Sequence, residues 1–211
     1  MTSGTPIVFV VDDDASVLRG LERLLRSAGF TAATFASAPE FLERYDRNAA
    51  GCVILDLAMP GFDGLQMQKA LTDRGCVLPI IFLTGHGDIP TSVQAMKGGA
   101  VDFLTKPVTD DELLAAVRKA IERCEALYRA REEIAIIRRR VATLTPRERE
   151  VLTHLLSGKL NKQIAADLGT VEHTIKVHRA RVMEKMQVRT LAALVRLAER
   201  AGIEAATPTE G

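Results

Sequence analysis

Several apolar runs of this sequence end in residues that can carry out polar chemistry. Four of these runs end in, or directly before, a carboxylate, a hydroxyl or an amine: Asp12 and Asp13 after residues 7–11, Asp56 in CVILD, Thr84 in PIIFLT and Lys106 after VDFLT. Carboxylate oxygens are hard ligands that suit Mg²⁺, and one carboxylate can also act as a nucleophile. A bound metal ion and a lysine can both stabilise the charge of a phosphoryl group. The set therefore indicates magnesium-assisted phosphoryl chemistry.

The elements around these residues must bring them to one place. Residues 7–11, 31–35, 52–56, 79–84 and 101–105 read as strands, and helical spacing follows in 17–28, after the capping pair Ser37 and Glu40, in 65–71 and in 91–97. Continuous apolar strands that alternate with helices predict a parallel sheet covered on both faces. Ligands of such open sheets bind beyond the carboxyl ends of the strands, which is where the polar residues stand.

The middle of the chain reads as one long helix. Thr109 and Glu112 form a capping box, and apolar residues recur at helical spacing from Leu113 to Val141. No glycine or proline interrupts this stretch, although Arg131 interrupts the apolar series. A pair of helices with a short break is the alternative.

The last third reads as helices only. Thr145, Pro146 and Glu148 give an N-cap, a first-turn proline and a capping glutamate, and Gly158 and Gly169 separate the segments that follow. The third of these segments has a basic face with Lys176, Arg179 and Arg181, and Lys185 stands further along it. A basic helix on a helix-turn-helix scaffold fits the major groove of DNA, whereas a solvated basic face is the alternative.

Composition sets the limits of these interpretations. The chain has 211 residues and a formal net charge of +1, with an acidic excess before residue 110 and a basic excess after residue 141. Its apolar runs are too short to cross a membrane, so we expect no membrane partner and a cytoplasmic protein. The three cysteines, Cys52, Cys76 and Cys124, have no metal-ligand spacing and indicate thiols in a reducing compartment.

The motifs VVDDD, ILDLAMPGFDG, FLTGHG and AMKGGAVDFLTKP together resemble the receiver domain of two-component response regulators. This resemblance implies a doubly wound, flavodoxin-like α/β domain with a five-stranded parallel sheet over residues 1–123. It also implies that Asp56 accepts a phosphoryl group from a sensor histidine kinase, and that Thr84 and Lys106 contact the phosphate. The Mg²⁺ ligands would be Asp13, Asp56, the main-chain carbonyl of Ala58 and, through water, Asp12. Thr84 and Phe103 would form the switch that reports phosphorylation.

Residues 143–203 look like a DNA-binding domain of the LuxR/FixJ/NarL type, through LTPREREVL, NKQIA and TIKVHRARVMEKM. The whole chain therefore resembles a FixJ-like transcriptional response regulator, with a helical linker over 124–142 and an all-α helix-turn-helix domain over 143–211 that ends in a short flexible tail. The resemblance places Lys176 and Val177 in the DNA groove and Lys162, Thr174 and His178 near the DNA backbone, beside Arg179 and Arg181 of the basic face. Ala180 and Val171 depart from the family, which has a long polar residue and a Ser or Thr there.

The partners implied are the kinase, double-stranded promoter DNA, RNA polymerase and a second copy of the phosphorylated chain. We expect no enzyme activity. A magnesium-dependent phosphatase with an aspartyl-phosphate is one alternative, but Ala58 stands where such enzymes have a second acid, and no insertion is long enough for a substrate cap. An output domain that binds RNA or protein is another.

Asp14 is expected to act only as the N-cap of the first helix, and His86 as an ordinary loop histidine rather than a second phosphoacceptor. The Lys106–Pro107 peptide bond is predicted to be cis, which would turn Lys106 inward before the next helix begins.

Overall fold

The computed structural model describes residues 5–46, 49–85 and 88–205. Contacts within the chain divide it into a first unit, residues 1–129, and a second unit, residues 130–211. His86 lies outside the described residues, so the expectation for it is not addressed.

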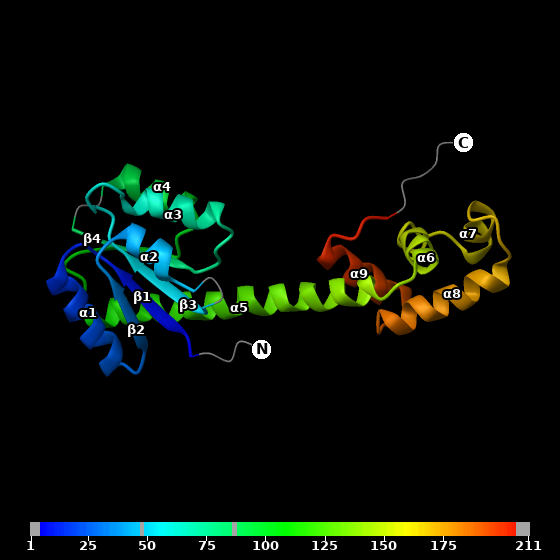
Figure 1. The fold of residues 1–211 in the computed structure, drawn as a ribbon, viewed down its shortest axis with the longest axis horizontal. Helices are drawn as coiled ribbons and strands as arrows, with labels where there is room; N and C mark the ends of the chain where they lie inside the picture. The colour runs from blue at the N-terminus through cyan, green and yellow to red at the C-terminus, as the bar shows by residue number, and fades with distance from the viewer. Residues whose placement is uncertain (1–4, 47–48, 86–87, 206–211) are drawn as a thin grey trace. The chain divides into compact units, whose positions relative to one another are not determined.

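The first unit is built on a five-stranded sheet (Figure 1). Its strands are β1 (Ile7–Val11), β2 (Thr31–Phe35), β3 (Gly51–Leu55), β4 (Ile80–Thr84) and β5 (Asp102–Thr105). They lie in the order β2-β1-β3-β4-β5, and every neighbouring pair is parallel. This confirms the predicted doubly wound, flavodoxin-like sheet.

Helices cover both faces of this sheet, as Figure 1 shows. The helices of the first unit are α1 (Ala15–Ser27), α2 (Ala38–Arg44), α3 (Gly64–Asp73), α4 (Ile89–Lys97) and the N-terminal part of α5 (Asp110–Ala142). Side chains alternate along β1, so that Val8 and Val10 pack with α1 and α5, while Phe9 and Val11 pack with α2, α3 and α4. The alternation explains why each strand is apolar at consecutive positions.

The capping residues predicted from the sequence fix several helix starts. Asp14 is the N-cap of α1 and accepts hydrogen bonds from the main-chain N (2.7 Å) and the hydroxyl (2.6 Å) of Ser16, as expected. Thr109 and Glu112 exchange the reciprocal bonds of a capping box before α5. Ser37 caps α2, but the carboxylate of Glu40 accepts its bond from the amide of Ala36 rather than from that of Ser37.

Helix α5 runs without a break from Asp110 to Ala142, a length of 33 residues. The predicted single helix is therefore confirmed, and the alternative of two helices with a break is wrong. Its N-terminal part contributes Leu113 and Val117 to the first unit, and Tyr128 still packs there and donates a hydrogen bond from its hydroxyl to the carbonyl of Ala49 (2.9 Å). Its C-terminal end contributes Ile137 to the core of the second unit.

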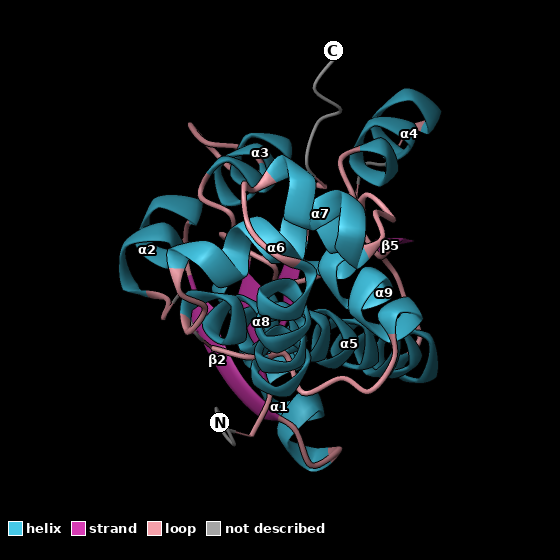
Figure 2. Cartoon of the chain, turned by 90° about the vertical axis from the view of Figure 1, so that its right-hand side faces the viewer, coloured by secondary structure: helices cyan, strands magenta, loops and turns pink. Residues whose placement is uncertain are grey.

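The described part of the second unit contains helices and loops but no strand (Figure 2). After the end of α5 it consists of α6 (Pro146–Leu156), α7 (Asn161–Asp167), α8 (Glu172–Lys185) and α9 (Leu191–Ala201). Apolar residues at helical spacing form its core: Leu144, Val151, Leu155, Ile164, Ala165, Ile175, Val182 and Met186 are buried, and Leu168 is partly buried. This confirms the predicted helix-turn-helix unit. None of the described helices is long and apolar enough to span a membrane.

Candidate phosphoacceptor site and nucleic-acid interface

The register of the sheet brings the two buried aspartates side by side. Val11 of β1 pairs with Leu55 of β3, so Asp12 and Asp56 follow at the same level on neighbouring strands. Both carboxylates are buried, with 3% and 6% of their residue surface exposed. A buried carboxylate is costly unless it is hydrogen-bonded or paired with a cation, so this pair requires a counter-ion.

Lys106 supplies that counter-ion. Its ammonium donates to Asp12 Oδ2 at 2.7 Å and to Asp56 Oδ1 at 3.2 Å. The remaining carboxylate oxygens accept from the main chain, Asp12 Oδ1 from the amide of Asp14 and Asp56 Oδ2 from the amide of Ala58, each at 2.9 Å. The structure therefore joins Asp12, Asp56 and Lys106 in one hydrogen-bonded cluster.

The pKa of Lys106 reflects the charges of the two carboxylates that surround it. Partial burial of Lys106 alone would lower its pKa, but hydrogen bonds and attraction from Asp12 and then from Asp56 outweigh burial, and its pKa lies above the usual value. Lys106 therefore remains a cation at neutral pH. The Lys106–Pro107 peptide bond is cis, as predicted.

Thr84 and Phe103 lie on the two strands next to this cluster. Thr84 ends β4 and is fully buried, and its carbonyl accepts a hydrogen bond from the amide of Lys106 at 2.8 Å. Phe103 on β5 pairs in register with Phe82, and their ring centroids are 6.0 Å apart. Its ring is half-buried against the core beneath α4. A change at Thr84 can thus reach Phe103 through adjacent strands.

The donor chemistry of this edge suits Mg²⁺, which prefers oxygen ligands and retains several waters. Asp12 and Asp56 are already together, whereas Asp13 and Ala58 are exposed beside them. Within the described residues, no group of three His, Cys, Asp or Glu side chains stands ready to hold a metal ion. An ion here would bind to few carboxylates and complete its shell with water.

Gly64 lies in close contact with the backbone of Asp56 and was not among the residues singled out from the sequence. A Cβ atom at Gly64 would lie 2.5 Å from the carbonyl oxygen of Asp56 and 3.0 Å from Cα of Leu57. The first turn of α3 therefore packs directly against the backbone that carries Asp56, and its N-cap Asp63 forms a capping box with Gln66. The signal in the sequence was a glycine directly after a capping aspartate.

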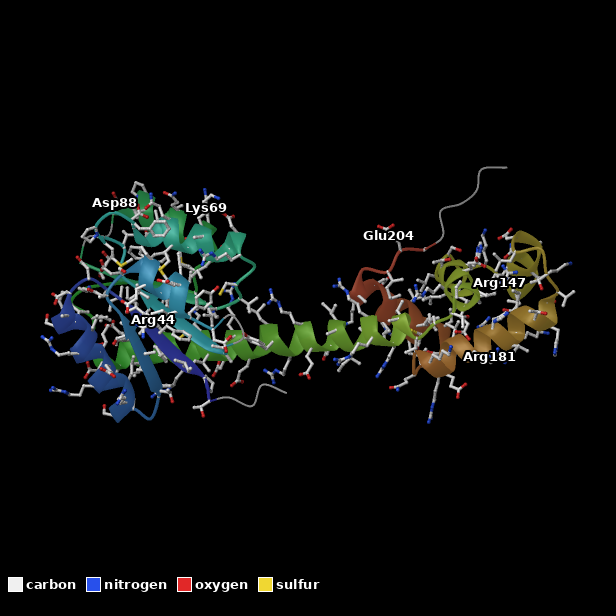
Figure 3. The ribbon with its side chains drawn as sticks, viewed as in Figure 1. Arg44, Lys69, Asp88, Arg147, Arg181 and Glu204 are labelled. Atoms are coloured by element: carbon white, nitrogen blue, oxygen red, sulfur yellow. The ribbon has the colours of Figure 1, made fainter. Side chains whose placement is uncertain are left out.

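The second candidate site is the exposed side of α8. Lys176, Val177 and Arg181 are exposed, whereas Thr174 and His178 are half-buried, and Lys162 is exposed on α7. Arg147 on α6 and Arg181 on α8 are labelled in Figure 3. The structure therefore places the seven predicted DNA-binding residues on the α7–α8 pair, with different exposures.

Several cations of this unit already have partners. Lys176 is 3.2 Å from Glu172 one turn earlier, and Arg179 donates to Asn161 Oδ1 at 3.2 Å. Lys185 turns to the buried carboxylate of Glu148 at 2.6 Å, so it does not extend the basic face as its position in the sequence suggested. Exposed ion pairs such as the first contribute at most about 1 kcal/mol and can exchange for other anions.

The start of α8 lacks a cap. Val171 is the N-cap residue, its side chain is 66% exposed, and it forms no side-chain hydrogen bond to the first turn. The departure from Ser or Thr therefore leaves amide donors at the start of α8 without a side-chain acceptor. The hydroxyl of Thr145 does cap α6, where Glu148 completes a capping box.

Comparison with known proteins identifies a family for each of the two units. Residues 8–118 match the response regulator receiver domain family, and residues 142–198 match the family of bacterial regulatory proteins of the luxR type. Nodulation protein W of Bradyrhizobium diazoefficiens is 47% identical over 94% of this chain and 88% of its own length. Transcriptional regulatory protein FixJ of the same organism is 45% identical over 93% of this chain and 96% of its own length.

Two solved structures are similar to this chain over most of its length. The response regulator StyR has 46% sequence identity and a TM-score of 0.81 over 93% of this chain and 100% of that one. Full-length FixJ from B. japonicum has 44% identity and a TM-score of 0.58 over 95% of this chain and 99% of that one. With both family matches, in this order, the chain belongs to the two-component response regulators that join a receiver domain to a LuxR-type DNA-binding domain.

Proposed function

We propose that Asp56 is the phosphoacceptor of this response regulator and that its phosphorylation controls dimerisation and promoter binding. The observation that carries the proposal is the cluster in which Lys106 bridges the buried carboxylates of Asp12 and Asp56. A free carboxylate oxygen electron pair of Asp56 attacks the phosphorus of a phosphohistidine, and the imidazole leaves with the electrons of the broken P–N bond. Lys106 and Thr84 then hold the phosphoryl oxygens.

A bound Mg²⁺ would supply charge neutralisation on the phosphoryl oxygens. Asp13, Asp56 and the main-chain carbonyl of Ala58 would hold the ion, with Asp12 acting through water. The chain itself is not proposed to turn over a separate substrate. It carries the phosphoryl group as a signal, in the cytoplasm where kinases of this type deliver it.

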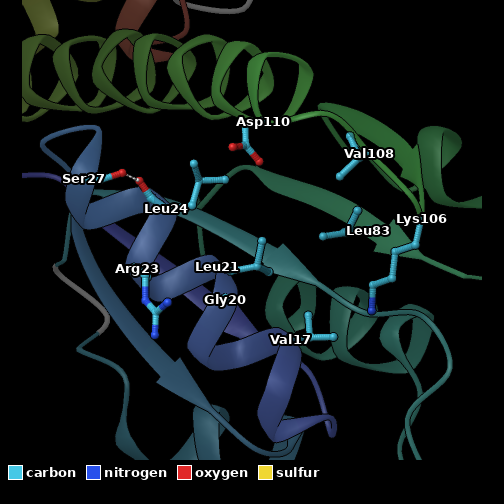
Figure 4. Close-up of a pocket in the computed structure, with 10 residues that line it drawn as sticks. All are labelled: Val17, Gly20, Leu21, Arg23, Leu24, Ser27, Leu83, Lys106, Val108 and Asp110. Atoms are coloured by element: carbon cyan, nitrogen blue, oxygen red, sulfur yellow. Dashed lines mark hydrogen bonds between the residues drawn. The ribbon is translucent and has the colours of Figure 1, made fainter.

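The kinase would dock on a groove beside the phosphoacceptor site (Figure 4). This cavity of about 630 Å³ is lined by Val17, Leu21 and Leu24 of α1, by Leu83, and by Lys106 and Val108. Its apolar wall from α1 can accept an apolar helix of the kinase. Because Lys106 belongs both to the groove and to the carboxylate cluster, a kinase helix seated there would be next to Asp56.

Helix α4 offers a surface for a second copy of the chain. Ile89, Val93 and Met96 expose 80%, 44% and 46% of their surface. Apolar side chains gathered on one helix mark an interaction site more often than isolated ones do. In the proposed switch, phosphorylated Asp56 draws Thr84 toward it, Phe103 packs further inward, and this α4 surface pairs with its copy.

Dimerisation would explain why DNA binding depends on phosphorylation. A small helix-turn-helix unit makes few phosphate contacts, so its monomer binds weakly and in a salt-sensitive way. Two units on one dimer can occupy successive major grooves about 34–36 Å apart. The second contact then benefits from a high effective concentration. RNA polymerase is the proposed partner at the promoter.

Intact mass tests the phosphoacceptor. With Mg²⁺ and acetyl phosphate, the wild-type chain should gain one phosphoryl group, and the Asp56→Asn variant should gain none. A phosphorylated Asp56→Asn variant would show that another residue accepts the group.

Gel shifts with duplex DNA test the output. DNA binding should tighten when acetyl phosphate is added to the wild-type chain and stay unchanged with Asp56→Asn. Release of inorganic phosphate from many equivalents of donor would instead favour the phosphatase alternative, and preference for RNA over duplex DNA would favour an RNA-binding output domain.

Sedimentation tests the dimer. The chain should be monomeric alone and dimeric with the phosphate mimic beryllofluoride. If it stays monomeric at every concentration that binds DNA, relief of inhibition rather than dimerisation controls binding.

A further inference from the structure

The outward face of α8 follows from which of its residues are buried. Ile175 and Val182 are completely buried in the core of the second unit. The positions opposite to them are exposed at helical spacing: His173, Lys176, Val177, Ala180 and Glu184. Ala180 lies near the middle of this exposed strip, and Val177 lies one turn earlier beside it.

We propose that Val177 and Ala180 form an apolar pair that contacts the C5 methyl groups of thymines in the major groove. The inference rests on the proposed DNA binding and deepens it by naming the base that this helix face selects. Thymine is the base whose major-groove edge carries a methyl group, and alanine and other apolar side chains make contact with it.

The chemistry of Val177 and Ala180 favours contact with thymine methyl groups over hydrogen bonds to base edges. Neither side chain has a donor or acceptor, so neither can bond to guanine, cytosine or adenine edges. Val177 leaves 39% of its surface exposed, although valine is usually buried in proteins. Contact with thymine methyls would remove that apolar surface from water.

The neighbouring charges do not occupy the middle of the face. Lys176 lies to one side of it and pairs with Glu172, whereas Arg179 lies toward the core and bonds to Asn161. These groups can bond to phosphates or to a guanine at the edge of the site. Around the helix, the patch formed by Val177 and Ala180 lies between Lys176 and Arg181, and His173 and Glu184 lie at its two ends along the strip. The patch itself is apolar, so its base preference is set by shape and methyl contact.

The spacing limits how many bases the pair can read. Side chains three residues apart on a helix have Cβ atoms about 5–6 Å apart. Base pairs rise about 3.4 Å per step. Val177 and Ala180 therefore reach thymines that are one or two base pairs apart, on the same strand or across the groove.

Two other exposed apolar side chains of the described second unit provide a matched control. Leu160 and Val171, with 69% and 66% of their surface exposed, immediately precede α7 and α8 and do not belong to the outward strip. Val171→Ala also removes two methyl groups, as Val177→Ala does, but at the N-cap of α8.

The experiment uses the full chain with beryllofluoride. Duplexes are selected from a random pool, and each thymine of the selected half-site is then replaced by deoxyuridine, which lacks only the methyl group. We expect one or two thymines at which the replacement weakens binding about three- to ten-fold. If no duplex is enriched from the random pool, the proposed DNA binding itself is contradicted.

Variants then assign the methyl contact. In Val177→Ala, the loss of DNA affinity that deoxyuridine causes at one thymine should disappear, while the losses at other thymines remain. In Val171→Ala, deoxyuridine should cause the same losses of affinity as in the wild-type chain. Ala180→Gly, which deletes the contacting methyl group, should likewise remove the affinity loss that uracil causes at the neighbouring thymine. The proposal is overturned if duplexes are selected but no thymine responds to uracil, or if Val177→Ala retains the same uracil losses as the wild-type chain.

Discussion

A single ammonium group bridges two buried carboxylates at the edge of the receiver sheet. The partners of Lys106 come from positions 94 and 50 residues away in the sequence, so their contact depends on the sheet register. The order of residues identified Asp12, Asp56 and Lys106 as candidates because each stands at the end of a strand. The hydrogen-bonding pattern among them could not be predicted from order alone.

The close approach of Gly64 to Asp56 leads to a prediction at this scale. Gly64→Ala would force apart backbone atoms of α3 and of the loop that carries Asp56, at a cost of about 1–3 kcal/mol in stability. We expect slower phosphorylation by acetyl phosphate, followed by intact mass over time. Gly20→Ala is the control, because a Cβ at Gly20 meets nothing within 4 Å. Equal rates for both variants and the wild-type chain would contradict a positioning role for Gly64.

The uncapped start of α8 gives a second prediction. Val171 has the extended backbone of an N-cap, with φ −97° and ψ 151°. Val171→Ser should therefore cap the helix and stabilise it by about 0.5–2 kcal/mol. Amide hydrogen exchange in the first turn of α8 should slow in this variant and should not slow in Val171→Ala. Unchanged exchange in both would mean that the serine finds no amide to accept from.

Secondary-structure elements were predictable where their packing is repetitive. Strands β1, β3 and β4 were found most directly because both faces of the sheet are covered, which makes these strands almost continuously apolar. The helix starts were found because their capping residues lie within four positions of each other. By contrast, Lys185 was placed on the basic face, and only the packing of α6 against α8 brings it to Glu148, 37 residues away.

Glu148 of α6 connects α8 with the turn before α6, and it makes the stability of the second unit depend on pH. The carboxylate accepts from Lys185 and from the amide of Thr145, and Lys185 also donates to the carbonyl of Thr143. The hydrogen bond from Lys185 and then the bond from Thr145 hold the pKa of Glu148 below its usual value. Because the folded pKa is the lower one, this stabilisation is present above about pH 4.3, the pKa in the unfolded chain, and is lost as pH falls through the folded pKa.

The corresponding variant is Glu148→Gln. It should reduce the stability of the second unit by about 2–3 kcal/mol near neutral pH, because a charged hydrogen bond and its ion pair are lost. Urea unfolding monitored by hydrogen exchange in α6 and α8 should show a smaller loss of stability between pH 6 and 3 than in the wild-type chain. Glu150→Gln, at an exposed pair with Arg147, is the control. An identical acid dependence in Glu148→Gln and the wild-type chain would exclude this role.

For the whole molecule, the continuity of α5 is the feature that can be tested. Ala130 is exposed at the junction of the two units, so proline there removes a helix hydrogen bond and clashes with the preceding turn, at a cost of about 3 kcal/mol or more. We expect Ala130→Pro to be phosphorylated normally and to bind DNA, but with less difference in affinity between the two phosphorylation states. Gel shifts with and without beryllofluoride measure this difference.

Ala130→Gly is the matched control, since glycine costs only about 1 kcal/mol relative to alanine and keeps the amide. Its response to beryllofluoride should lie between those of the proline variant and the wild-type chain. If the proline variant responds as fully as the wild-type chain, the signal does not depend on an unbroken α5.

The sharing of α5 between two cores also limits how such proteins can recombine. Tyr128 still packs in the first unit, and Ile137 is already buried in the second. A crossover that exchanges output domains between two relatives must therefore fall between Tyr128 and Ile137. At any other point of α5, one domain would receive a core residue that comes from the other relative. Each residue gained or lost at the joint also turns the following helix by about 100°, so only exchanges that preserve the length of this segment keep its helical phase.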